Sequence, residues 1–202
     1  MTPLTILALG HFPASAIEPL FRHFSPVELI EVPIPPRSSL DDHKGELNRA
    51  VDAAANDWIF VLREREVVDD QLAAEIGRVT GGANAWGFRI ASTPFYAGKA
   101  LRIGREEGEI RLFHRRHYTR FEARREAKTI RIQGTVIRLQ NALRAVTFES
   151  VGEHRQYLER TAVPHSAVRS ALLFLRNVLA ARTLDPNTLR YLWIEASFDH
   201  GM

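Results

Sequence analysis

Over its first 82 residues the chain alternates between short apolar runs and longer segments whose apolar residues recur every three or four positions. The strand-like runs are residues 4–9, 27–34 and 58–62. The helix-like segments are residues 14–24, 47–54 and 68–79. The run WIFVL at 58–62 is apolar on both faces, which is typical of a central strand in a parallel sheet. This β-α-β-α-β-α order predicts an α/β fold with right-handed crossovers.

The pattern changes after Gly82, where two glycines end the last of these helices. Strand-like runs follow at residues 85–103, 109–116 and 129–140, and the last of them is expected to be a pair of strands with Gly134 between. Helical patterns return at residues 151–163 and 166–184 and around Leu189, Leu192 and Trp193. We therefore predict a compact α/β sandwich that forms a single domain over residues 1–202. Its expected parts are a Rossmann-like half (1–82), an antiparallel, arginine-rich half (83–148) and a helical C-terminal tail (149–202).

Composition places the chain among soluble globular proteins, with 45% hydrophobic and 25% charged residues. The chain has no cysteine, which excludes disulfides, thiolate catalysis and cysteine-ligated metal sites. No basic segment precedes the first apolar run, and no run approaches the ~18 apolar residues of a membrane span. These features predict a cytoplasmic protein.

Charge is distributed unevenly along the chain. Residues 1–80 contain 7 Arg and Lys against 13 Asp and Glu, a net charge of −6, and residues 81–202 contain 20 against 11, a net charge of +9, which together give the overall +3. A basic second half favours an anionic partner such as phosphate, nucleic acid or an acidic membrane. The alternative is that the two halves attract one another within the fold.

The stretch GELNRAVDAAANDWIFVLREREVVDDQLAAEI, residues 45–76, resembles the centre of family 2 glycosyltransferases with the GT-A fold, above all those of bacterial lipopolysaccharide-core and cell-envelope synthesis. Those proteins carry a helix ending in K-N-x-A-L-x-x-A and then D-W-V-L-x-L-D-A-D-E. Three later runs resemble family motifs in the same order: GFRIASTPFYAGKALRI, EIRLFHRRHYTRFE and SVGEHRQYLERTAV. The resemblance covers roughly residues 45–165. It implies a GT-A-like fold and a nucleotide sugar or phosphorylated glycan as ligand.

The resemblance places the metal-binding acid pair of the family at Arg63 and Arg65. In the family, a divalent cation held by carboxylates neutralises the diphosphate that departs from the sugar. Residues at i and i+2 of an extended chain point to the same side, so two cations replace two metal ligands. Glu64 and Glu66 have the same spacing but fall on the opposite face. They would rebuild a manganese or magnesium site only through a bulge, and otherwise we expect no cofactor.

Other positions of the family's site are altered as well. VELIEVPIPPRSS has no acid where the family holds the nucleoside, and no histidine stands near Arg144, where the family has a metal ligand. The candidate general base falls on Glu126, without the histidine that precedes it in the family. Arg111, in the EIRLFHRR run, is a further candidate site residue. Losses at separate places predict a non-catalytic accessory or binding protein in glycan synthesis. The alternative is metal-independent transfer, with Arg63 and Arg65 on the donor diphosphate.

Two segments are candidates for contact with other molecules. Residues 111–131 contain eight Arg and Lys, two His and two Glu, interleaved with aromatic residues. Residues 169–184 are strongly apolar, with arginines on one side, which is typical of a helix in a membrane interface or in a core. We predict that these segments contact a protein partner or an anionic membrane surface, with the protein peripheral to the inner face. Nucleic acid is disfavoured, because no recognition motif is present.

Overall fold

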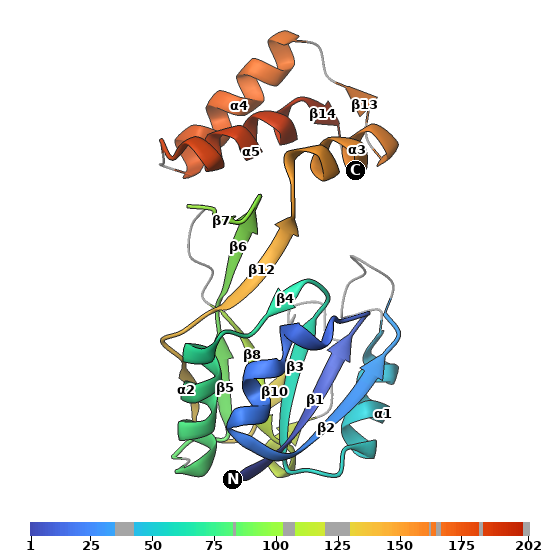
Figure 1. Cartoon of the computed structure of the whole chain (residues 1–202), viewed down its shortest axis with the longest axis vertical. Helices are drawn as coiled ribbons and strands as arrows, with labels where there is room; N and C mark the ends of the chain where they lie inside the picture. The colour runs from blue at the N-terminus through green and yellow to red at the C-terminus, as the bar shows by residue number, and fades with distance from the viewer. Residues whose placement is uncertain are drawn as a thin grey trace. The chain divides into compact units, whose positions relative to one another are not determined.

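The computed structural model describes residues 1–34, 43–82, 84–102, 108–119, 130–161, 163–164, 167–181 and 184–199. Helices and strands alternate along the first part of the chain, and the sheets contain both parallel and antiparallel pairs, so the α/β class is confirmed (Figure 1). The largest sheet has six strands in the order β11-β5-β8-β3-β1-β2. In that order they are β11 (Val136–Arg138), β5 (Gly87–Ile90), β8 (Glu109–His114), β3 (Trp58–Arg63), β1 (Thr2–Leu9) and β2 (Phe24–Val32).

The three predicted parallel strands lie together in this sheet. β1 pairs in parallel with β2 on one side and with β3 on the other. β8 then runs antiparallel to both β3 and β5. At the far edge β11 is parallel to β5, so the expectation that the strands around Gly134 pair with one another is wrong. The backbone explains the difference, because the N–H groups of Trp86 and Gly87 donate to the carbonyl of Thr135 and hold this segment against β5.

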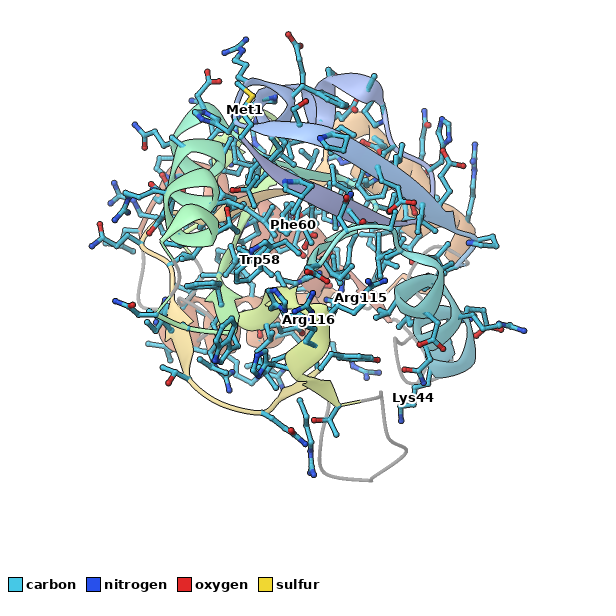
Figure 2. The ribbon with its side chains drawn as sticks, turned by 90° about the horizontal axis from the view of Figure 1, so that it is seen from below. Met1, Lys44, Trp58, Phe60, Arg115 and Arg116 are labelled. Atoms are coloured by element: carbon cyan, nitrogen blue, oxygen red, sulfur yellow. The ribbon has the colours of Figure 1, made fainter. Side chains whose placement is uncertain are left out.

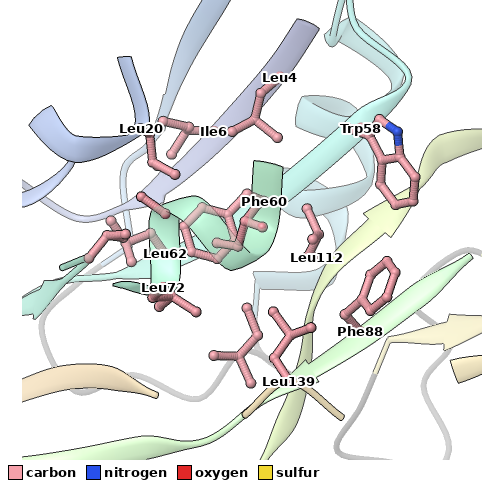
Figure 3. Close-up of a cluster of buried hydrophobic side chains, with 14 of the residues drawn as sticks. Leu4, Ile6, Leu20, Trp58, Phe60, Leu62, Leu72, Phe88, Leu112 and Leu139 are labelled. Carbon is pink, nitrogen blue, oxygen red and sulfur yellow. The ribbon is translucent and has the colours of Figure 1, made fainter. Parts of the chain in front are cut away.

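β3 is buried on both faces, as its sequence predicts, because its alternate residues enter two separate cores. Phe60 and Leu62 belong to the core on one face, which also contains Leu72 of α2 (Asp70–Gly81) (Figure 3). Ile59 and Val61 enter the core on the other face, beneath α1 (Lys44–Ala53). The two helices therefore cover opposite faces of the sheet and fix the position of the end of β3.

The helix expected over residues 14–24 is replaced by two short 3-10 helices, η1 (Ala14–Ala16) and η2 (Glu18–Arg22). Pro19 lies in the first turn of η2. A proline has no N–H to donate and its ring clashes with the preceding turn, so a continuous α-helix cannot cross this position. The apolar spacing is still used, since Ile17 and Leu20 enter the core.

Short strands and the C-terminal helices complete the chain. β4 (Glu66–Val67), β12 (Leu143–Phe148), β6 (Ser92–Tyr96) and β7 (Lys99–Ala100) form a second sheet in that order. The segment η4 (Arg115–His117) precedes the pair β9 (Tyr118–Thr119) and β10 (Arg131–Ile132), and β13 (Val163–Pro164) pairs with β14 (Phe198–Asp199). The helices of the predicted tail are α3 (Val151–Thr161), α4 (Ala167–Ala181) and α5 (Pro186–Ala196).

The chain divides into two compact units, each built from two segments. Unit 1 contains Met1–Ser92 and Glu106–Arg144, and unit 2 contains Thr93–Arg105 and Ala145–Met202. The sequence predicted one domain of three consecutive parts instead. The six-stranded sheet lies in unit 1. Unit 2 has its own core, built from Tyr96, Leu101, Phe148, Leu158 and Ile194.

Candidate functional site at the carboxyl ends of β1 and β3

The carboxyl ends of β1 and β3 form the switch point of the parallel part of the sheet. The chain leaves β1 for β2 on one side and later returns to β3 on the other side. In open α/β sheets, ligands bind outside the carboxyl ends of the strands at such a point. Here the N–H of Glu64 donates to the carbonyl of Leu9 at 2.9 Å. Gly10 has a φ of +94°, and a Cβ on it would lie 3.1 Å from the Cβ of Glu64, so this close approach favours glycine.

The chain turns after Arg63, which differs from the extended segment that the alternating RERE sequence predicts. β3 ends at Arg63, Glu64 and Arg65 form a turn, and β4 begins at Glu66. Arg65 has a left-handed φ of +63°. The rule that residues at i and i+2 share a face therefore does not apply here. Arg65 is exposed and Glu64 is half-buried.

Glu66 is folded back into unit 1 by this turn. One of its carboxylate oxygens accepts from the N–H of Arg63 at 2.7 Å. The other lies 2.9 Å from Nη2 of Arg111 and 3.3 Å from the hydroxyl of Ser92. The side chains of Arg111 and Glu66 are only 4% and 5% exposed. Glu66 therefore forms a buried ion pair, a geometry that the sequence did not indicate.

Glu109 joins the two arginines into one network. Its carboxylate lies 2.6 Å from Nη2 of Arg63 and 3.4 Å from Nε of Arg111. The strand-end network is the group Arg63, Glu66, Ser92, Glu109 and Arg111. It contains two guanidinium groups and two carboxylates, so its formal charges balance. Ion pairing of this kind satisfies buried charges within the protein.

The network brings together some of the predicted site residues and leaves out others. Arg63, Glu66 and Arg111 meet in it, whereas Arg65 and Glu64 lie in the turn beside it. Glu126 lies outside the described residues. Sequence reasoning missed Glu109 and Ser92. The signal for Glu109 was its position two residues before Arg111 on one strand, because such residues share a face.

No group of three or more His, Asp and Glu side chains is placed to hold a metal ion within the described part of the chain. Two carboxylates of the site, Glu66 and Glu109, already bind arginines. A cation there would have to displace a guanidinium from a buried carboxylate. The expectation of no cofactor, with Glu64 and Glu66 as metal ligands only in the alternative, stays a prediction.

An aromatic and basic cluster lies near the amino end of β3. His117 stacks on Trp86 with ring centroids 4.0 Å apart, and His114 makes edge contacts with Trp86 and Trp58. Asp57 lies 3.2 Å from Arg116 and 3.9 Å from His114. Trp58, Arg115 and Arg116 are labelled in the view of Figure 2. The two histidines are thus held by ring packing, as parts of a structural cluster.

His114 gives the protein a defined sensitivity to acid. Burial lowers the pKa of His114 below its usual value, and Asp57 offsets this only in part. The unfolded chain therefore takes up the proton first as pH falls through about 6.5, and the free energy of unfolding decreases. We expect urea unfolding between pH 7.5 and pH 5 to show a weaker pH dependence in His114→Phe. His11→Gln, at an exposed position, is the control that should keep the wild-type slope. A slope unchanged in His114→Phe would contradict this assignment.

Two comparisons with known proteins identified no relative of this chain. No protein-family model matches the chain, and no curated protein matches it either. Within the described residues, no helix has both the length and the apolar character required to cross a bilayer.

Proposed function

We propose that this protein is a divergent family 2 glycosyltransferase-like protein, with a GT-A-like fold, that does not transfer sugar. It acts as an accessory or binding protein in glycan or cell-envelope synthesis. The observation that carries the proposal is the buried ion pair of Glu66 with Arg111 at the switch point of the sheet. The acid that follows the strand is used to neutralise an arginine and not to hold a cation.

A nucleotide diphosphate that departs from the sugar carries negative charge. A transferase with this fold needs a positive group at the strand end to stabilise that charge. Arg63 occupies the position of the first family acid, but its guanidinium lies 2.6 Å from Glu109. A diphosphate would have to compete with that carboxylate and would meet its negative charge. The strand-end network thus supports the proposal that the fold was retained after the donor site was lost.

The location and partners follow from the same proposal. We propose a cytoplasmic protein that binds a protein partner or a phosphorylated glycan in place of a nucleotide sugar. The arginine-rich segments after residue 108 supply positive charge for an anionic ligand. The resemblance of its motifs to family 2 glycosyltransferases supports a role in glycan synthesis, and binding of nucleotide sugars is the part of that role that can be tested directly.

Thermal unfolding in the presence of nucleotide sugars tests the proposal. A ligand that binds only the native state raises the melting temperature by mass action. We expect no shift with uridine-, guanosine- or cytidine-linked sugars, either with manganese or with a chelator. A shift that requires manganese would mean that Glu64, Glu66 or other acids form a metal site, and it would overturn the proposal.

The alternative function is metal-independent sugar transfer. It is favoured by one observation: Arg63 is 39% exposed and Arg65 is exposed, both at the switch point. This alternative requires a melting shift that survives the chelator and is lost in the double variant Arg63→Ala, Arg65→Ala. Arg49→Ala is the matched control, because Arg49 is an exposed, ion-paired arginine on α1. A shift with this profile would replace the non-catalytic proposal.

A further inference from the structure

The exposed face of α4 carries several large apolar side chains, in contrast to the usual surface of a helix in a globular protein. Leu172, Leu175 and Leu179 are between 57% and 76% exposed. Their spacing of three and four residues places them on one side of the helix. Large apolar side chains gathered in a contiguous exposed patch mark a binding surface, whereas single ones do not.

Arginines flank this leucine stripe. Arg169 and Arg176 are exposed on α4, and Arg190 is exposed on α5. Trp193, one turn after Arg190, is 45% exposed and packs edge-on against Phe174 of α4 at 5.3 Å. Among the described side chains of α4 and α5, every exposed one is apolar or an arginine. We call the exposed residues Arg169, Leu172, Leu175, Arg176, Leu179, Arg190 and Trp193 the leucine–arginine surface.

Asp185 and Glu195, the acids before and within α5, both have partners within unit 2. Asp185 caps α5 by accepting from the N–H of Thr188 at 2.8 Å. Glu195 lies 2.8 Å from the ring of the buried His154. Neither acid is among the exposed residues of the surface, so the surface presents positive charge beside the leucines.

α3 provides an internal comparison within the same unit. Its exposed residues are Gly152, Arg155, Gln156, Glu159 and Arg160. They are polar apart from the glycine and carry both signs of charge, which is the ordinary pattern of a solvated helix face. The leucine–arginine surface is therefore a local feature of α4 and α5 and does not reflect the general composition of unit 2.

The positive charge of the leucine–arginine surface decides which kind of molecule can bind to it. A second copy of this surface would bring arginines against arginines, and like charges held close together oppose association. An anionic lipid surface supplies phosphates for the arginines and acyl chains for the leucines. Tryptophan is favoured at the boundary between the two regions of a bilayer. The 15 residues of α4 are too few to span the hydrocarbon core, so the helix would lie in the plane of the interface.

We propose that the leucine–arginine surface docks unit 2 onto the surface of an anionic membrane, with the leucines of α4 inserted and the arginines at the lipid phosphates. This inference is independent of the sugar chemistry proposed above, because it uses no residue of the strand-end network. It concerns where the protein acts, whether or not it transfers sugar.

Sedimentation of the full chain with lipid vesicles tests the proposal. We expect binding to vesicles of equimolar phosphatidylcholine and phosphatidylglycerol, weak binding to phosphatidylcholine alone, and a loss of affinity as salt rises. The double variant Arg169→Gln, Arg176→Gln should lower the partition coefficient by about thirtyfold, because each arginine near an anionic surface strengthens binding roughly fivefold. The double variant Leu172→Gln, Leu179→Gln should lower it on the order of a hundredfold.

The controls separate a lost surface from a lost fold. Leu29→Gln with Ile137→Gln changes two exposed apolar residues of unit 1 and should leave vesicle binding unchanged. All variants should keep the wild-type circular dichroism and melting temperature, because the changed side chains are exposed. If the leucine variant does not fold, a blue shift of Trp193 fluorescence on anionic vesicles, absent in Trp193→Phe, supplies an independent reading.

Three results would overturn the proposal. The first is the absence of binding to either kind of vesicle. The second is binding that survives in the leucine double variant. The third is a dimer, detected by analytical ultracentrifugation without lipid, that dissociates in the leucine variant while vesicle binding is absent. This last result would assign the surface to a second copy of the chain.

Discussion

Replacing Arg111 with Met is expected to lower the free energy of unfolding by about 3–5 kcal/mol, as when one partner of a buried ion pair is removed. The guanidinium of Arg111 lies 2.9 Å from Glu66 and 3.4 Å from Glu109, and its side chain is almost fully buried. Without it, the carboxylate of Glu66 would lose its ion-pair partner in the interior. Guanidinium chloride unfolding at neutral pH, followed by far-ultraviolet circular dichroism, measures the loss.

A second substitution distinguishes the uncompensated charge from lost packing. Glu66→Gln removes the charge but keeps an oxygen that accepts from the N–H of Arg63. We expect the double variant Arg111→Met, Glu66→Gln to be clearly more stable than Arg111→Met alone, since the coupling between contacting residues is of the order of 0.5–3 kcal/mol. If the two losses simply add, the ion pair does not carry the stability of this site.

The position of β3 could be predicted from sequence, but the geometry that follows it could not. The five apolar residues Trp58 to Leu62 are buried and leave a clear signal, because a short continuous apolar run of this length is typical of a strand that is buried on both faces. The alternating charges of Arg63, Glu64, Arg65 and Glu66 also fit a strand that continues, because side chains of a strand alternate with a period of two residues. This alternation is the only local pattern in the stretch. The turn at Arg65 depends on a left-handed backbone that is uncommon for arginine.

The partner of Glu66 illustrates why site chemistry is harder to predict than strand order. Arg111 is 45 residues away in sequence and reaches Glu66 from β8. Nothing in the local pattern of either strand states that β8 runs antiparallel beside β3. The resemblance to glycosyltransferases predicted that Arg63 stands at the position of a family acid, but it could not indicate that Glu109 pairs with Arg63.

The fold shows the same division between local and distant signals. α1 and α2 were predicted from one apolar stripe each, and Asp69 caps α2 by accepting from the N–H of Leu72. The helix over 14–24 was predicted wrongly, because the apolar spacing outweighed the proline in its middle. The two-residue strands β9, β13 and β14 were not predicted, since strands this short have no periodicity, whereas β10 lies within the predicted strand-like run 129–140.

Replacing His154 with Ala is expected to destabilise unit 2 by about 3 kcal/mol, through the loss of a buried ring and of its hydrogen bonds. His154 is fully buried between aromatic rings, 4.2 Å from Phe148 and 5.2 Å from Tyr191 between centroids. Its Nε2 lies 2.8 Å from Glu195, and its Nδ1 lies 3.3 Å from the hydroxyl of Tyr96. Urea unfolding followed by tryptophan fluorescence reports on this unit through the part of the signal that is lost in Trp193→Phe.

His154→Phe separates the two contributions to this loss. Phenylalanine keeps an aromatic ring in the stack but removes both hydrogen bonds, so an intermediate loss of roughly 1–2 kcal/mol is expected. The exposed His11→Ala should change stability by less than about 0.5 kcal/mol. If His154→Phe is as unstable as His154→Ala, the hydrogen bonds to Glu195 and Tyr96 dominate. If both variants unfold like the wild type, His154 does not organise the core of unit 2, and the buried contacts of Tyr96 and Phe148 must suffice without it.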